Sequence, residues 1–347
     1  MNDYIKKKMC LEDNTIQLNE LFHICVLGKG RFGTVCLVHN TISLYAIKII
    51  PKVYFENDKQ MQKYLLTEKK IMLSLDYPLI IKLVKTLKTD NLCFFLLEFI
   101  NGINLEDLIS SKVILKNIPE VTFFAACISL ILDYLNKNHI IHRDIKPSNI
   151  LINKNGYYKI TDFGTSKIIK DFTFTSLGTP NYMAPEILIG KGYSYPADYF
   201  SFGVCLFFMY YGKYPFGEGK KEIMDIYDDI LHKNIVFPNN ESNVENLNNF
   251  ISNLLNKNPI NRPCSLYRIK NFSFFNKFEW NLLETFKMKP PFKLKNSEIK
   301  NENNCLKNKR TLFLDFISKN KFENSLLLNK NNSYDTKRDY SNWFDIF

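Results

Sequence analysis

Hydrophobic residues in the first third of the chain fall into short runs separated by polar turns. This spacing is typical of β-strands. The runs cover residues 22–27, 34–38, 45–50, 83–86 and 93–99. One longer segment, 60–75, instead places several apolar side chains on one face, as an amphipathic helix does. Residues 22–97 are therefore predicted to form a small antiparallel β-sheet with one helix.

After residue 101 the apolar positions recur at helical spacing over longer segments. They predict helices over residues 105–110, 119–138, 197–211, 220–232 and 244–256. The prediction is an α+β fold of two lobes: a small sheet lobe over 22–97, and a larger, mainly α-helical lobe over about 101–275. Residues 1–21 are mostly polar and are predicted to be an N-terminal extension.

The loop 142–149 is the most polar interruption of this apolar pattern. It carries a carboxylate, an ammonium group and a carboxamide within six residues, at Asp144, Lys146 and Asn149. Burying such groups without partners would cost roughly 2–7 kcal/mol each even when neutral, so the loop is a poor core segment. Each group suits phosphoryl transfer, because the three can accept a proton, neutralise a phosphate and hold a metal.

The glycines Gly28, Gly30 and Gly33 lie between two predicted strands, with no helix after them. This context argues against a dinucleotide fold, where such a motif opens a helix. It fits a hairpin lid over phosphates, although an ordinary glycine hairpin explains the motif taken alone. Lys48 lies inside the next strand, and Glu68 lies on the predicted helix. Each could be a plain surface charge. The distance of Lys48 from the hairpin favours a functional role for it, and Glu68 would then be the partner that fixes Lys48 against a nucleotide.

A second carboxylate, Asp162, follows a predicted strand and is followed by Phe and Gly. Together with Asn149 it makes an oxygen-ligand pair suited to Mg²⁺, which retains water and phosphate oxygens as its other ligands. A hydroxyl cluster follows at Thr173, Thr175, Ser176 and Thr179. Most such clusters are solvated loops. This one lies between the Asp-Phe-Gly and Ala-Pro-Glu sequences, and protein kinases carry their activating phosphates in such a segment.

The complete ordered set of motifs resembles a eukaryotic protein kinase from Phe22 to about residue 275. The resemblance implies that ATP binds in the cleft between the lobes, with the adenine against Val35, Ala46 and Leu151. The ATP-binding residues it implies are Leu27, Gly28, Lys29, Gly30, Arg31, Phe32, Gly33, Thr34, Val35, Ala46, Lys48, Leu97, Glu98, Ile100 and Leu151.

The same resemblance implies individual roles. Asp144 would be the catalytic base, and Thr179 would bond both Asp144 and Lys146. Lys48 would contact the phosphates and pair with Glu68. Asn149 and Asp162 would hold Mg²⁺. These roles make ATP and Mg²⁺ the expected cofactors and protein Ser/Thr hydroxyls the expected substrates.

Finer features resemble the AGC group, most closely its cGMP- and cAMP-dependent kinases. Residues 276–347 would then be an AGC-type tail, within which 296–331 matches poorly and is expected to be mobile. Phe344 and Phe347 are expected to dock on the small lobe. Thr175 is the expected site of an activating phosphate that pairs with Arg143.

The likeness also implies an upstream activating kinase. Since the chain shows no cyclic-nucleotide-binding domain, control by a cyclic nucleotide would need a separate regulatory subunit. The cyclic-nucleotide-dependent kinases read basic substrates partly with acidic residues, and at the matching positions this chain has Asn104, Ser148 and Phe208. A weaker preference for Arg before the phosphoacceptor is therefore predicted.

Charge and cysteine content set further limits. The net charge is +11, but the lysines are scattered among asparagines, so a nucleic-acid surface is not expected. No membrane span is expected, because the longest apolar run, 199–211, is shorter than the ~20 residues that one needs. None of the eight cysteines forms a C-x-x-C pair, which favours free thiols in the cytoplasm, with the nucleus as a second location.

The sequence therefore predicts an ATP- and Mg²⁺-dependent Ser/Thr protein kinase. Two alternatives stay open. One is a catalytically weak or dead nucleotide-binding scaffold, which the intact Lys48, Asp144, Asn149 and Asp162 disfavour. The other is a basic interaction protein in which the motifs have no catalytic use, which the complete ordered set disfavours.

Overall fold

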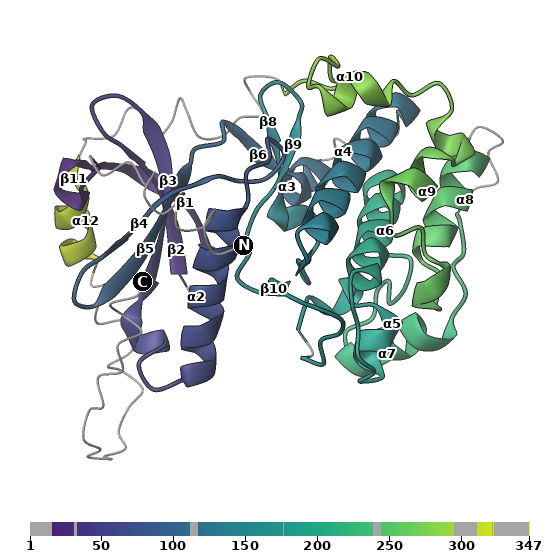
Figure 1. Cartoon of the computed structure of the whole chain (residues 1–347), viewed down its shortest axis with the longest axis horizontal. Helices are drawn as coiled ribbons and strands as arrows, with labels where there is room; N and C mark the ends of the chain where they lie inside the picture. Colours follow the sequence, from purple (N-terminus) through teal and green to yellow (C-terminus); the bar gives the residue numbers. More distant parts are fainter. Residues whose placement is uncertain are drawn as a thin grey trace. The chain divides into compact units, whose positions relative to one another are not determined.

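In the computed structural model the chain divides into two units, which are described separately (Figure 1). The structure describes residues 16–30, 33–111, 117–175, 177–238, 244–294, 311–320, 322 and 347. The first unit contains residues 1–77, 81–101 and 300–347, and the second contains 78–80 and 102–299.

The first unit is built on one antiparallel sheet in the order β11-β1-β2-β3-β5-β4. The strands are β1 (Phe22–Gly30), β2 (Gly33–His39), β3 (Leu44–Pro51), β4 (Leu83–Lys88), β5 (Leu92–Glu98) and β11 (Thr311–Leu312). Apolar side chains from alternating strand positions fill one core, including Cys36, Ile47 and Phe94. The other face of the sheet is covered too, because Cys93 and Phe95 at the intervening positions of β5 are also fully buried.

Helix α2 (Lys59–Ser74) packs with this sheet. It begins after Asp58, whose side chain accepts hydrogen bonds from the backbone N–H groups of Gln60 and Met61. This N-cap satisfies donors that the first helical turn leaves without partners. The buried face of the helix carries Leu65 and Ile71, as its apolar spacing predicts, and it also carries Glu68.

Part of the stretch expected to be mobile is ordered. Residues 311–320 form β11 and helix α12 (Phe313–Lys319), which lie together at the edge of the first sheet in Figure 1. The N–H of Phe313 donates to the carbonyl of Leu21 at 2.9 Å, and the Phe313 ring meets the Phe94 ring at 5.9 Å. A few apolar residues therefore order a segment whose average composition is polar.

The expectation for residues 1–21 also needs correction at its end. Ile16 and Leu21 are buried in the core of the first unit, beside Phe313 and Ile317 of α12. Between them lies a short 3₁₀ turn, Leu18–Glu20. Residues 16–21 are thus part of the folded unit, because the edge of β1 and α12 together enclose their apolar side chains.

The second unit is mainly helical and carries two small sheets, ordered β6-β8-β9 and β10-β7. Its strands are β6 (Gly102–Asn104), β7 (Ile140–Ile141), β8 (Ile150–Asn153), β9 (Tyr158–Ile160) and β10 (Lys167–Ile168). Its α-helices are α3 (Leu105–Ser110), α4 (Ile118–Lys137), α5 (Pro185–Leu188), α6 (Pro196–Tyr211), α7 (Ile223–His232), α8 (Glu245–Leu254), α9 (Leu266–Lys270) and α10 (Trp280–Glu284).

Helices α4 and α6 form the centre of the second unit (Figure 1). Helix α6 is apolar all round and buried along nearly its whole length, and it ends at Gly212 in the left-handed conformation (φ +70°). Helix α4 is long and apolar enough to cross a membrane by length and composition alone. Since 72% of its most apolar window is buried inside the protein, its apolar surface is explained by packing.

Candidate active site

The loop 142–149 is fixed by hydrogen bonds to Asp198, which lies in the first turn of α6. The two carboxylate oxygens of Asp198 accept hydrogen bonds from the backbone N–H groups of His142 at 2.7 Å and Arg143 at 2.8 Å. Arg143 has a positive φ of 70°, an unfavourable conformation for a bulky residue, which these bonds help to fix. Burial raises the pKa of Asp198, and its hydrogen bonds and nearby positive charges oppose that rise.

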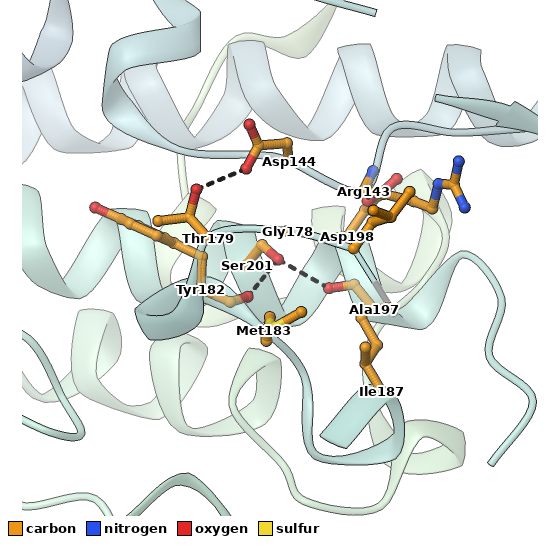
Figure 2. A pocket seen from close by; sticks show the side chains of 11 residues that line it. Arg143, Asp144, Gly178, Thr179, Tyr182, Met183, Ile187, Ala197, Asp198 and Ser201 are labelled. Carbon is orange, nitrogen blue, oxygen red and sulfur yellow. Dashed lines mark hydrogen bonds between the residues drawn. The ribbon is translucent and has the colours of Figure 1, made fainter. Parts of the chain in front are cut away.

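Asp144 lies at the centre of a small polar cluster, of which Figure 2 shows the bond to Thr179. The hydroxyl of Thr179 donates to its Oδ1 at 2.9 Å, and the ammonium group of Lys146 lies 2.8 Å from its Oδ2. Lys146 also donates to the Thr179 hydroxyl at 2.9 Å. A loop residue and its near neighbour are thereby tied to a threonine more than thirty residues later in the chain. Figure 2 shows Thr179 pointing toward Asp144, while the guanidinium of Arg143 points away.

Asn149 completes the cluster and connects it to Asp162. Its amide nitrogen donates to the carbonyl of Asp144 at 2.9 Å and to Asp144 Oδ2 at 3.0 Å, which directs its Oδ1 elsewhere. The carbonyl of Asn149 accepts from the N–H of Thr161 at 2.9 Å and from its hydroxyl at 3.1 Å. Asp162 therefore follows directly on a residue bound to Asn149.

This donor set fits Mg²⁺. An amide oxygen at Asn149 and a carboxylate at Asp162 are hard ligands, and Mg²⁺ is commonly held by one or two carboxylates with phosphate and water oxygens. Among the described residues no group of three or more His, Cys, Asp and Glu side chains could hold a metal ion by itself. A resident metal held entirely by such side chains is not indicated there, whereas a metal that arrives with a phosphate ligand fits.

The three glycines of the hairpin in the first unit differ in the space around them: a side chain would clash at one position and would fit at the other two. A Cβ at Gly33 would lie 2.2 Å from the carbonyl oxygen of Ile49, so no side chain fits there. Among the residues that the structure describes, a Cβ at Gly28 would meet nothing within 4 Å, and one at Gly30 would touch only Gly33, at 3.8 Å. Protein packing therefore does not require glycine at positions 28 and 30, and the backbone there is open to a ligand. Arg31 and Phe32 lie outside the described residues.

Lys48 and Glu68 form the ion pair that the sequence predicted. Strand β3 and helix α2 bring Lys48 Nζ to 2.7 Å from Glu68 Oε1. The Lys48 side chain is 19% exposed and the Glu68 side chain 7% exposed. The Lys48 side chain is thus not fully enclosed by the protein.

The other predicted adenine contacts are distributed over both units. Ala46 on β3 pairs with Leu97 on β5, and Val35 lies on β2. Leu151 belongs to β8 of the second unit, where it pairs with Asn104. Glu98 Oε1 accepts from the N–H of Lys82 at 2.8 Å, so this side chain fixes the chain at the end of β5.

Comparison with known proteins identifies the family. The Protein kinase domain family matches residues 23–275. The chain belongs to the protein kinase family. It is 35% identical over 294 residues to the cGMP-dependent protein kinase of Plasmodium berghei (strain Anka), an alignment that covers 83% of this chain and 34% of that protein.

Two further relatives support placement among the AGC-group Ser/Thr kinases. The cAMP-dependent protein kinase catalytic subunit of Dictyostelium discoideum is 34% identical over 282 residues, covering 80% of this chain and 43% of that protein. Ribosomal protein S6 kinase alpha-3 of Homo sapiens is 34% identical over 281 residues, covering 77% and 37%. This kinase chain therefore spans less than half the length of these relatives.

The segment between Asp162 and Glu186 contains Thr175, the predicted phosphorylation site, and the other hydroxyl groups of its cluster. Thr173 is buried, and its hydroxyl accepts a hydrogen bond from Lys167 at 2.9 Å. Thr175 is half-buried, and its carbonyl accepts from the Tyr193 hydroxyl at 2.6 Å. Ser176 lies outside the described residues. Thr175 is thus more accessible to a modifying enzyme than Thr173.

Arg143 is buried beside this segment with unused donors. It is 4% exposed, and its Nε donates to the carbonyl of Thr165. Its Nη1 and Nη2 have no hydrogen-bond partner among the described residues. A buried guanidinium with unsatisfied donors is costly, and an added anion would lower that cost.

Phe347 docks on the first unit, as predicted. Its ring meets the Phe95 ring edge-on at 5.3 Å, and its carbonyl oxygen accepts from Thr86 at 3.1 Å and from Lys69. Lys69 Nζ also lies 5.4 Å from the centre of the Phe347 ring. Because Lys69 is the neighbour of Glu68 on α2, the docked residue contacts the helix that supplies the ion pair. Phe344 lies outside the described residues.

Three residues at the site escaped the sequence analysis. Thr161 binds the Asn149 carbonyl, Lys167 binds Thr173, and Tyr214 stacks on Phe208 at 4.7 Å. The signal for Lys167 was its position five residues after Asp162. Nothing in the local pattern marks Tyr214, since its partner lies on another element.

Proposed function

We propose that this protein is an ATP- and Mg²⁺-dependent Ser/Thr protein kinase, which transfers the γ-phosphoryl group of ATP to Ser or Thr hydroxyls of proteins. The observation that carries the proposal is the cluster of Asp144, Lys146, Asn149 and Thr179, joined by bonds of 2.8–3.0 Å. The family and its Ser/Thr kinase relatives support the same reaction.

Each member of the cluster has a task in this reaction. Asp144 orients the substrate hydroxyl and accepts its proton as the phosphorus–oxygen bond forms. Lys146 neutralises the negative charge on the transferred group. Thr179 bonds both Asp144 and Lys146, so it holds the two at the spacing that the reaction needs. Asn149 and Asp162 would hold Mg²⁺, which neutralises phosphate charge when bound.

The first unit supplies the proposed contacts to the ATP phosphates. Lys48 presents a positive charge to the phosphates while Glu68 fixes its position. The backbone at Gly28 and Gly30 is open, which suits close approach by phosphate oxygens.

Regulation is proposed to act through Thr175 and Phe347. A phosphate on Thr175 would add roughly −1.5 to −2 charge and could satisfy the Nη groups of Arg143. An upstream kinase would add this phosphate, and a separate regulatory subunit would be needed for control by a cyclic nucleotide. The six cysteines within the described residues are free thiols, which supports a cytoplasmic or nuclear location.

The test is phosphate transfer by purified protein to Ser and Thr peptides, with ATP binding measured on the same samples. Asp144→Asn should lower kcat by about 10²–10⁴-fold and leave ATP binding nearly unchanged. Asp162→Asn should weaken binding of Mg²⁺-ATP instead, because it removes a metal ligand. Asp225→Asn, an exposed position on α7, is the control.

Normal turnover by Asp144→Asn at saturating ATP would refute its assignment as the base. Tight ATP binding by the unaltered protein without any transfer would establish the catalytically dead scaffold. If neither ATP binding nor transfer occurred, the nucleotide function itself would be wrong.

A further inference from the structure

A row of aromatic rings extends from the pocket that contains Asp144. Tyr182 lines that pocket together with Asp144 and Thr179 (Figure 2). The Tyr182 ring meets the Tyr214 ring edge-on at 5.8 Å. Tyr214 in turn stacks on Phe208 of α6, with ring centres 4.7 Å apart and planes inclined by 22°. We call Phe208 and Tyr214 the aromatic shelf.

The aromatic shelf is accessible while the first ring of the row is not. Tyr182 is buried, whereas Phe208 and Tyr214 each keep part of their surface in solvent. The backbone N–H of Tyr214 donates to Glu218 Oε2 at 2.7 Å, which fixes the loop that carries the ring. The shelf is therefore a preformed aromatic surface, connected through the Tyr182 ring to the pocket that Asp144 lines.

Asn104, one of the positions where the resembling kinases carry an acidic residue, offers little to a positively charged side chain. It occupies the N-cap of α3, and its Oδ1 accepts the N–H of Asp107 at 2.7 Å. The amide N–H groups of Asn104 cannot pair with a guanidinium, which consists of donors only. Glu106 and Asp107 in the first turn of α3, and Glu218 beside Tyr214, are the acidic residues that could still attract a cation.

An aromatic surface of this kind suits an apolar or aromatic side chain. Aromatic side chains bury a large apolar area, and their positive edges pack against the negative faces of other rings. Phe208 and Tyr214 cover one face of each other, and Tyr182 adds a third ring to Tyr214. A cation binds to the face of an aromatic ring, so an Arg side chain is the competing ligand.

We propose that the aromatic shelf is a specificity subsite, which selects protein substrates with a large apolar or aromatic side chain near the phosphoacceptor Ser or Thr. This inference rests on the proposed kinase function, and it replaces a preference for Arg with a positive preference of a different class. Phe208 and Tyr214 are positioning residues in it, since they contact the substrate away from the reacting atoms.

The test uses a set of Ser peptides that differ at one position before the phosphoacceptor, which carries Ala, Leu, Phe or Arg. The unaltered enzyme should favour Leu and Phe over Ala by about tenfold in kcat/KM, the scale expected for partial burial of one such side chain. Arg should gain no more than about twofold. The gain should appear mainly in KM, because the shelf binds substrate without touching the reacting atoms.

Variants separate recognition from folding. Tyr214→Ala should reduce the Leu and Phe preference to about twofold, with kcat on the Ala peptide retained. Phe208→Glu should reverse the order, so that Arg peptides become the favoured ones. A role confined to packing would not produce this reversal. Tyr267→Ala removes an equally large, exposed ring elsewhere in the second unit and is the matched control.

Peptide binding, measured by fluorescence anisotropy, tests the shelf independently of phosphate transfer. If no peptide is phosphorylated but Phe peptides bind better than Ala peptides, the shelf stands and the kinase proposal fails. If peptides are phosphorylated with equal efficiency for Ala, Leu and Phe, the shelf is refuted while the kinase proposal stands. A native preference for Arg that Tyr214→Ala abolishes would overturn the choice of ligand.

Discussion

Two pairs of opposite charge, one in each unit, differ in the burial and in the chemical type of their positively charged partner. In the second unit Arg262 makes two bonds to Glu186, of 2.6 and 2.8 Å, and its guanidinium also donates to three backbone carbonyls. Arg262 is fully buried. In the first unit Lys48 Nζ lies 2.7 Å from Glu68 Oε1, and the Lys48 side chain is 19% exposed.

The difference indicates two uses of the same charge chemistry. A guanidinium is a rigid fork, and when all of its donors are occupied it fixes backbone segments in one arrangement. An ammonium group on a flexible stem can exchange or share partners, which suits contact with a ligand that enters and leaves. We therefore interpret the Arg262 pair as architectural and the Lys48 pair as functional, and the following predictions test that division.

The largest effect is expected from Arg262→Met. It leaves the buried Glu186 carboxylate without its partner, which should lower the free energy of unfolding by about 3–5 kcal/mol. Urea denaturation measures this loss. Lys270→Met breaks a partly exposed pair with Glu284 and should cost only about 0–1 kcal/mol, so it is the control. Equal losses in the two variants would contradict the architectural role of Arg262.

Lys48→Met should show the opposite balance. Phosphate transfer should fall by about 10²–10³-fold, because a group aimed at phosphate charge is removed. The loss in unfolding free energy should be smaller than for Arg262→Met, about 1.5–3 kcal/mol for one hydrogen bond to a charged group. The exposed Lys63→Met on the same helix as Glu68 is the control for both measurements. A variant with intact turnover would place Lys48 among the architectural charges.

Phe347→Ala tests whether the functional pair depends on the docked residue. Removing the buried ring should lower the free energy of unfolding by about 1.5–3 kcal/mol. It should also reduce activity, because Phe347 contacts Lys69 next to Glu68. Phe347→Leu retains most of the apolar volume and should lose less of both. A drop in melting temperature with unchanged activity would show that the docked residue stabilises the unit without acting on the ion pair.

The smallest effect is a pH dependence beside Arg262. Burial, with a further contribution from the Arg262 charge, lowers the pKa of Lys257 from 10.5 to about 8. Its Nζ lies 3.7 Å from the centre of the Phe216 ring. As pH falls from 10.5 toward 8, the unfolded chain binds this proton first, so the lysine contributes less stability. The free energy of unfolding should therefore rise between pH 8 and 10.

Lys257→Met should lack that rise, and the difference between the two proteins isolates it from other groups that titrate in this range. In Arg262→Met the rise should become smaller, since one cause of the lowered pKa is removed. Identical slopes in all three proteins would mean that Lys257 titrates as an ordinary surface lysine.

Structural features that depend only on residues close together in the chain could be predicted from the sequence. Strand and helix positions followed from apolar spacing, because one buried face imposes a period of about 2 or 3.6. Asp144, Lys146 and Asn149 could be identified together because they lie within one loop. The family followed from the order of such local motifs. Their detailed roles are still predictions that the experiments above address.

Contacts between segments far apart in the chain became visible only in the three-dimensional structure. The sequence could not show that Asn104 uses its carbonyl as a helix cap, or that Tyr214 stacks on Phe208. The sequence also suggested that residues 311–320 are mobile, because the average composition of this stretch is polar. Whether a segment is ordered depends instead on the contacts that its few apolar residues make. Phe313 binds the backbone beside the start of β1 and packs into the core that the strands of the first unit form, and these contacts order the segment.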